Sequence, residues 1–319
     1  MPKLVFIHGI GGSRDSREHV TSWIGAFRRG AIRAGHQKVA DDPTCGGRVE
    51  IAFANYADLF RPSQAQGAGE PELSDEDAEA LIALLVEEID LRLDDGPPDD
   101  VRVKLRSART QLMPPGQKQG ALGPARRLLG VLTTLGSVLP HPVANWISAK
   151  VMRGHFAQVV RYLSRGEADN TGTTLDARIR DRVRAAIGDE PAIVVAHSLG
   201  SVVGLETLHE LTTPVPLFMT MGSPIGMRTV VWPRLRPQPP RTPETVGRWL
   251  NFWDHDDVIV ARSGWDGKIA PNTAGVVALT DRVDSTGLWV HPATTYLSTP
   301  GVAGPLAEAV ALLAGSADA

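Results

Sequence analysis

The 319-residue sequence contains a single cysteine, Cys45, which excludes a framework of internal disulfides. A lone thiol suits a reducing compartment, and the first residues do not show the charged and apolar pattern of a signal peptide. We therefore expect a cytoplasmic protein. The sequence also has no apolar run near the ~20 residues that a helix needs to cross a bilayer.

The sequence lacks an excess of basic residues, since 33 Lys and Arg stand against 36 Asp and Glu, for a net charge of −3. A chain with this balance offers no positive field for nucleic acid or for an anionic membrane surface. It also shows no internal repeat, no low-complexity tract, no cluster of metal ligands and no cofactor motif. Hydrophobic residues make up 42% of the chain, which is enough for one large core. We expect no nucleic-acid partner, no metal and no cofactor.

The stretch Pro191–Ser201 organises the sequence. Its residues Ile193–Ala196 form a short apolar run rich in β-branched side chains, typical of a strand buried on both faces of a parallel sheet. Apolar residues then recur at helical spacing over 202–211. Ser198 lies between the two, at the apex of a predicted tight turn from strand to helix. Such a turn holds the hydroxyl above the sheet, beside free helix N–H groups that can stabilise an oxyanion.

A second motif lies at the N-terminus, where an apolar run over Leu4–Ile7 leads into a loop with glycine at positions 9, 11 and 12. The glycines alone fit either a flexible turn or a phosphate-binding loop. A phosphate loop, however, would carry the Lys-Ser/Thr pair of a P-loop or a longer G-x-G-x-x-G pattern, and the sequence has neither.

The two motifs together resemble those of the serine α/β-hydrolase family, in particular its lipases and esterases. Ala196 stands where the family's G-x-S-x-G turn has its first glycine, and Gly200 provides the last. Small residues suit both positions because the turn brings strand and helix backbones close together. The resemblance implies the α/β-hydrolase fold, with a mostly parallel central sheet flanked by helices. It also implies Ser198 as nucleophile and an oxyanion hole made by the backbone N–H groups of Ile10 and Leu199.

Further strands are predicted over 48–55, 215–221, 248–253 and 275–280, with helices over 20–31, 175–187 and 301–315. These elements place the hydrolase core in residues 1–56 and 171–319. The intervening residues 57–170 contain no clear buried strand. Their long apolar stretches, around 123–140 and 145–163, favour helices with Arg and Lys around them.

We interpret residues 57–170 as a mainly helical cap over the catalytic serine, inserted into the core. A cap of this kind would build an apolar acyl pocket and could touch a membrane interface transiently. The alternative is that its helices only complete the core or form a contact between copies of the chain in a homo-oligomer.

A serine hydroxyl needs a histidine to take its proton and a carboxylate to orient that histidine. In this family the acid follows the nucleophile along the chain, and the histidine comes last. Three aspartates follow the 248–253 strand. Asp257 precedes a Val-Ile-Val segment, as the acid often does in the family, so we expect it to be the acid. Asp254 at the strand tip is the runner-up, and Asp256 comes third.

His291 is the one histidine beyond residue 255, so we expect it to be the base, with a plain surface-loop histidine as the alternative. His197 should point away from the neighbouring serine. His8 should brace the oxyanion loop through a backbone hydrogen bond, and His255 should lie at the rim of the site.

These inferences favour a serine hydrolase that cleaves small-molecule or lipid carboxylic esters through an acyl-enzyme. A thioesterase, peptidase or acyltransferase with the same triad is one alternative. Another is a lipid-binding or interaction protein that uses the hydrolase scaffold without turnover. The acyl chain length and the oligomeric state stay open from the sequence.

Overall fold

The centre of the protein, in the computed structural model, is a six-stranded sheet whose strands all run parallel. The structure describes residues 1–9, 16–60, 75–94, 96–113, 158–255, 257, 267–285 and 290–316. The strand order is β2-β1-β3-β4-β5-β6. Their bounds are β1 Lys3–Ile7, β2 Glu50–Ala54, β3 Ala192–His197, β4 Phe218–Met221, β5 Trp249–Asp254 and β6 Ala278–Val283.

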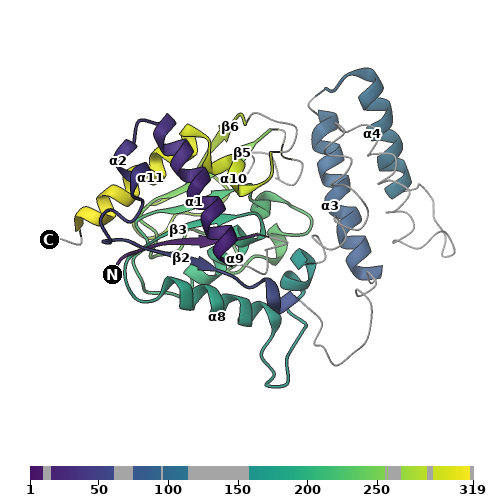
Figure 1. Cartoon of the computed structure of the whole chain (residues 1–319). Coiled ribbons are helices and arrows are strands. Elements are labelled where there is room, and N and C mark those ends of the chain that lie inside the picture. Colours follow the sequence, from purple (N-terminus) through teal and green to yellow (C-terminus); the bar gives the residue numbers. More distant parts are fainter. Residues whose placement is uncertain are drawn as a thin grey trace.

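Helices cover both faces of this sheet (Figure 1). On one face lie α8 (Leu175–Ile187) and α9 (Leu199–Leu208), and on the other α1 (Ser16–Arg33), α10 (Ala293–Leu297) and α11 (Pro300–Ser316). A short helix, α2 (Gln37–Asp41), packs beside α1 and α11.

Alternation along the central strand explains the two covered faces. All six residues of β3 are buried. Val194 and Ala196 belong to the hydrophobic cluster of α8 and α9, whereas Ile193 and Val195 belong to that of α1 and α11. An uninterrupted apolar run is what a strand between two helical layers requires. The expected α/β architecture with a parallel sheet is confirmed.

The chain changes direction across the sheet at β1. From β1 it goes to β2 on one side, and its next strand, β3, pairs with β1 on the other side. In parallel α/β sheets, ligands bind in the crevice outside the carboxyl ends of the strands at such a switch point. Here Gly9, after β1, lies against Ser198, after β3.

Two strands begin three residues later than predicted, and the other bounds differ by at most two residues. β4 begins at Phe218, because Val215 forms only an isolated bridge with Val246. β6 runs from Ala278 to Val283, three residues later than predicted. A turn before it explains the shift: Gly275 has a φ of 76° and donates its N–H to the carbonyl oxygen of Asn272. Glycine adopts a positive φ readily, so the turn can end at Gly275 and the strand begins only after it.

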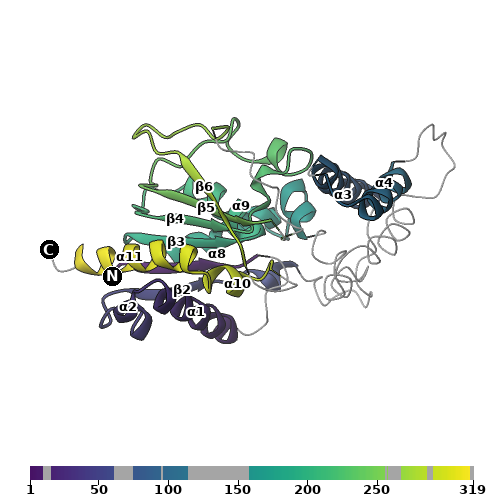
Figure 2. The ribbon, with the colours of Figure 1, turned by 90° about the horizontal axis from the view of Figure 1, so that it is seen from above.

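The described part of 57–170 is helical, as predicted. It contains η1 (Ala57–Phe60), α3 (Asp75–Asp94), α4 (Asp99–Leu112) and a helix over 158–164. Among these described residues no strand occurs, and Ala168 makes only an isolated bridge with Thr174. Figures 1 and 2 both show α3 and α4 side by side at the end of the molecule opposite the two chain termini.

The α3–α4 pair therefore lies toward the carboxyl ends of the strands, because β1 starts near the N-terminus and all strands run parallel. The Glu87 carboxylate joins α3 to the core: it accepts hydrogen bonds from the backbone N–H groups of Arg228 (2.7 Å) and Thr229 (3.0 Å). Residues 123–157, which hold most of the predicted acyl pocket, lie outside the described residues.

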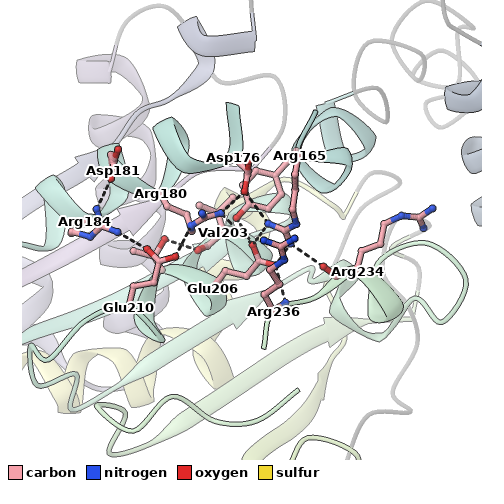
Figure 3. A network of polar contacts seen from close by, with 12 residues as sticks. Arg165, Asp176, Arg180, Asp181, Arg184, Val203, Glu206, Glu210, Arg234 and Arg236 are labelled. Carbon is pink, nitrogen blue, oxygen red and sulfur yellow. Dashed lines mark hydrogen bonds and ion pairs between the residues drawn. The ribbon is translucent and has the colours of Figure 1, made fainter. Parts of the chain in front are cut away.

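A buried ion cluster holds the end of the insertion against α9 (Figure 3). It consists of Arg165, Asp176, Arg180 and Glu206, whose side chains are between 2% and 14% exposed. Arg165 pairs with Asp176 (3.0 Å) and with Glu206 (2.6 Å), and Arg180 pairs with Asp176 (2.7 Å). The Tyr162 hydroxyl also donates to Glu206 (2.7 Å). The end of the insertion is thus attached to α9, the helix that follows Ser198.

No helix in the described part of the chain is both long enough and apolar enough to cross a membrane.

Candidate active site

Ser198 connects β3 directly to α9, as the strand–turn–helix pattern predicts. Its backbone has φ 53° and ψ −130°, so a residue other than glycine occupies the left-handed region. Such a conformation costs of order 1–3 kcal/mol and persists where the surrounding structure enforces it. The sharp turn leaves the serine at the carboxyl edge of the sheet, with a relative exposure of 1%.

The loop after β1 approaches Ser198 closely. A Cβ atom on Gly9 would lie 2.5 Å from the Ser198 Cβ and 3.2 Å from its Oγ. A Cβ on Gly200 would lie 2.4 Å from the carbonyl oxygen of His8. Distances this short exclude any side chain at either position. Gly200 is therefore required by the exit of β1, and not by the nucleophile's own strand as the motif suggested.

The structure brings His291 and Asp257 together at the same edge. The His291 Nδ1 lies 2.9 Å and 2.8 Å from the two carboxylate oxygens of Asp257. Since a carboxylate only accepts, Nδ1 carries the proton, and Nε2 is left as the basic nitrogen. Both residues are buried, with exposures of 8% and 2%. This is the pairing that the sequence favoured.

Tyr296 orients the same carboxylate. Its hydroxyl donates to the Oδ2 of Asp257 (2.8 Å) and accepts from the backbone N–H of Asp254 (3.1 Å). Burial, followed by the nearby charge of Asp257, raises the pKa of the Tyr296 phenol well above its ordinary value. The phenol therefore stays protonated and acts as a donor.

The other two aspartates have different positions. Asp254 ends β5, and its Oδ2 accepts the backbone N–H of Ser285 (2.6 Å). It thus caps a backbone group, whereas the carboxylate beside His291 Nδ1 is that of Asp257. Asp256 lies outside the described residues. His255 follows β5 within a turn.

Gly222, the residue after β4, marks where the side chains of the site converge. A Cβ on Gly222 would lie 3.2 Å from Asp257 Oδ2, 3.3 Å from His197 Nε2 and 3.4 Å from His291 Nδ1. The preceding residue, Met221, accepts the backbone N–H of Ser198 (3.0 Å). Met221 thus holds Ser198, and Gly222, the next residue, faces the His291–Asp257 pair.

The Ser198 Oγ makes no hydrogen bond with any described residue, His291 included. A buried hydroxyl without a partner costs of order 1–3 kcal/mol, and natural proteins contain few such groups. In unliganded active sites the hydrogen bond between nucleophile and base is often long and tightens when substrate binds. Ser198 is therefore held in place by its backbone, with its hydroxyl available.

His8 braces the loop after β1, as predicted. Its Nδ1 donates to the carbonyl oxygen of Gly9 (2.5 Å), and its Nε2 accepts the backbone N–H of Tyr56 (3.1 Å). The Tyr56 hydroxyl also donates to the His8 carbonyl oxygen. Burial lowers the pKa of His8 to about 4, so the ring is neutral near pH 7.

The two expected oxyanion donors are only partly described. Leu199 is the first residue of α9, and its N–H has no acceptor within the helix because no residue of that helix precedes it. Ile10, together with the glycines at 11 and 12, lies outside the described residues.

Two further serines, Ser201 and Ser223, lie beside the Ser198 turn. Ser201 Oγ donates to the carbonyl oxygen of Ser198 (2.6 Å) and is 2.7 Å from Ser223 Oγ. Ser223 Oγ in turn accepts the backbone N–H of Ile225 (3.2 Å). Both hydroxyls are thus engaged with the protein, which favours Ser198 as the nucleophile over either of them.

In comparisons with protein-family models, with curated proteins and with solved structures, no match to the chain was found. Within the described residues, no group of three or more His, Cys, Asp or Glu side chains is placed to hold a metal ion.

Two residues make contacts in the site that the sequence did not indicate. Tyr296 was assigned no role from the sequence, yet its hydroxyl donates to Asp257. His197 does not contact the Ser198 hydroxyl, but its ring is not directed out of the site: its Nε2 lies 2.6 Å from the carbonyl oxygen of His291. That contact joins residues 94 positions apart, which local patterns do not reveal.

Proposed function

We propose that the protein is a serine hydrolase that cleaves carboxylic esters, with Ser198 as nucleophile, His291 as base and Asp257 as acid. One observation carries the proposal: a buried serine with left-handed φ shares the edge of the sheet with a buried His291–Asp257 pair, and its hydroxyl has no partner among the described residues. Strained backbone and unpaired polar groups concentrate at functional sites because chemistry requires what stability disfavours.

Each residue has a defined role in this proposal. Ser198 Oγ attacks the carbonyl carbon of the ester while His291 Nε2 takes the hydroxyl proton. Asp257, held by Tyr296, keeps the Nδ1–H tautomer of His291 and stabilises the imidazolium that forms. The imidazolium then returns the proton to the departing alcohol, which leaves an acyl-enzyme. Water, activated by His291, hydrolyses that acyl-enzyme and regenerates the serine.

The N–H of Leu199, at the start of α9, can stabilise the tetrahedral oxyanion. The N–H of Ile10, in the loop after β1, would be the second donor. Loss of one such donor typically costs about 3 kcal/mol of transition-state stabilisation. The close approach of Gly9 to Ser198 supports this arrangement, because it brings the loop after β1 within van der Waals contact of the nucleophile.

The order of the elements supports the α/β-hydrolase fold as the finer description of this α/β protein. The nucleophile turn follows the central strand, the acid follows β5, and the base follows β6, in the chain order Ser, Asp, His. The site also lies at the switch point of the sheet. Ester hydrolysis is the reaction that the two motifs favour, and thioester or peptide cleavage would use the same three residues.

Labelling with a fluorophosphonate tests the proposal directly, because these reagents phosphonylate an activated serine. We expect the wild-type protein to be labelled at Ser198 and to hydrolyse nitrophenyl esters, with Ser198→Ala inactive in both assays. Tandem mass spectrometry must locate the adduct, since Ser201 and Ser223 lie nearby. Ser223→Ala is the matched control: it removes a buried serine of the same neighbourhood and should still be labelled.

A series of acetyl to octanoyl esters then identifies the preferred acyl group. A thioester and a peptide amide identify the leaving group. Each methylene buried in an acyl pocket is worth up to about 0.8 kcal/mol, a few-fold in kcat/KM. Near wild-type turnover by Ser198→Ala would show that the nucleophile lies elsewhere. A wild-type protein that is neither labelled nor active would favour a binding protein on this scaffold.

A further inference from the structure

His197 is a buried histidine that the proposed reaction does not use. It is the last residue of β3, it is 7% exposed, and it directly precedes Ser198. Its Nε2 lies 2.6 Å from the main-chain carbonyl oxygen of His291. Because a carbonyl oxygen only accepts, His197 is the donor, and its proton is on Nε2.

We propose that His197 is a positioning residue: its Nε2–H holds the His291 backbone so that the His291 ring faces both Asp257 and the nucleophile. The proposal rests on the proposed function, in which His291 is the base. His197 itself touches neither the substrate nor the transferred proton.

The surroundings of His197 leave its ring one orientation. Its ring centroid lies 4.7 Å from that of His291, and Trp23 packs edge-on against it from α1 at 6.1 Å. Gly222 leaves no side chain between the ring and the His291–Asp257 pair, since a Cβ there would lie 3.3 Å from His197 Nε2. A packed ring with one donor directed at one carbonyl fixes that carbonyl in space.

The His197 ring is also kept neutral. Among the described residues, the titratable groups around it are His8, Asp257, His291 and Tyr296. They come from the loop after β1, the loop after β5, the segment before α10 and α10 itself. Burial, followed by the nearby His291, lowers the pKa of His197 to about 3. A neutral neighbour matters here because a second cation would oppose the imidazolium that His291 becomes during the reaction.

The hydrogen bond from His197 also holds the segment that carries His291. His291 precedes α10, and its carbonyl belongs to a residue that is 8% exposed. A buried carbonyl without a donor would be costly, and a shift of about 1 Å in a catalytic group can cost roughly 10²-fold in rate. The same hydrogen bond thus satisfies the carbonyl and sets the place of the base.

Three variants of the full chain test the role. His197→Phe keeps a planar ring without the donor, His197→Leu is a smaller donor-free change, and His197→Gln keeps an N–H at a similar reach. His209→Phe is the matched control, because it removes a ring nitrogen that contacts another backbone carbonyl, that of Arg241 (3.0 Å), away from the site. Circular dichroism and melting temperature establish that each variant is folded.

The first readout is fluorophosphonate labelling, divided into reversible binding (KI) and reaction (kinact) and measured from pH 5 to 9. We expect kinact to fall roughly 10²-fold in His197→Phe and His197→Leu, at every pH, with KI within about two-fold. His197→Gln should recover at least a tenth of the wild-type kinact, and His209→Phe should match the wild type. A defect in folding alone would lower the amount of labelled protein and not kinact.

The second readout does not depend on turnover. The Nδ1–H of His291, hydrogen-bonded to Asp257, should give a far-downfield proton resonance, which Asp257→Asn assigns by removing it. We expect this resonance to be lost or broadened in the donor-free variants and retained in His197→Gln.

The outcomes separate the two proposals. A wild-type protein without labelling ends the proposed function, while a resonance that still depends on His197 upholds the positioning role. Normal labelling with kinact and resonance unchanged in a folded His197→Phe overturns only the positioning role. If the donor-free variants do not fold, His197→Gln decides: retention of the resonance supports the role of the donor, and its loss in folded protein refutes it.

Discussion

The two ends of helix α9 both carry buried polar groups, but these groups differ in their hydrogen bonding. At its start, Ser198 is 1% exposed, has a strained backbone, and leaves its hydroxyl without a partner among the described residues. Near its end, Glu206 is 3% exposed and accepts from Arg165, from Tyr162 and from the backbone N–H of Arg236 (Figure 3). The helix thus carries an unsatisfied hydroxyl at one end and a heavily bonded carboxylate at the other.

The difference indicates what each end does. In the ion cluster each charge faces an opposite charge, and removing one partner would leave a buried charge uncompensated. Around Ser198 the buried histidines, His8 and His197, are instead kept neutral by desolvation. Neutral rings, and a hydroxyl without a partner among the described residues, suit reactive or positioning roles, whereas paired charges join segments. Variants of the two ends should therefore separate activity from stability.

The largest effect is expected at the acid. Asp257→Asn keeps the shape of the side chain but removes the charge that holds the His291 tautomer, and a change of this kind costs about 10⁴-fold in kcat in serine proteases. Nitrophenyl ester kinetics and thermal melts measure it, with stability expected to change little. Asp254→Asn is the control, since the Asp254 carboxylate accepts the backbone N–H of Ser285. If Asp254→Asn were the crippled variant, the assignment of the acid would be wrong.

The next effect belongs to the other end of the helix and to stability. Glu206→Gln removes one of two carboxylates that face Arg165, so we expect a loss of about 3 kcal/mol in the free energy of unfolding. The labelling rate of the folded fraction should stay within a few-fold of the wild type. Glu210→Gln offers a matched control, because its carboxylate is 38% exposed and such pairs contribute about 1 kcal/mol or less. Equal losses in the two variants would contradict the role of the buried cluster.

The smallest effect for a single residue is the response to pH. The pKa values of His8 and His197 in the folded protein, about 4 and about 3, lie below the ordinary 6.5. The unfolded chain therefore binds these protons first, so stability is full above pH 6.5 and falls as the pH drops toward 4 and 3. At pH 5 each histidine should cost about 2 kcal/mol relative to pH 7. Urea unfolding at both pH values measures the loss.

His197→Gln should remove about half of that pH dependence. Asp176→Asn should leave the dependence between pH 7 and 5 unchanged. Burial works to raise the pKa of Asp176, but hydrogen bonds from Thr174, Arg180 and Arg165 outweigh it and hold the pKa at about 2. Its contribution is present above its ordinary value of 3.8 and is lost as the pH falls through 2. An unchanged slope in His197→Gln would mean that this ring is not neutral and buried in solution.

Much of the fold follows from local patterns. The apolar run of β3, the helical spacing after Ser198 and the stripe over 175–187 each produced the element that was predicted, because burial between two layers demands the period that the sequence shows. The short helices α2 and α10 were missed, since five residues are too few for a period. Helix α4 was not predicted as a separate helix, although the whole segment 57–170 was expected to be mainly helical.

By itself, the sequence determined the chemistry available: one serine on a strand–helix turn, one late histidine and three aspartates in four positions. Tertiary structure decided which of these meet. Asp257 pairs with His291 because the chain after β5 folds back on Asp254 and because Tyr296 reaches the same carboxylate. The left-handed φ of Ser198 and the hydrogen bond from His197 to His291 likewise depend on strands far apart in sequence. Residue patterns report local periodicity, whereas hydrogen bonds across 30 to 90 residues form only once the sheet has aligned its strand ends.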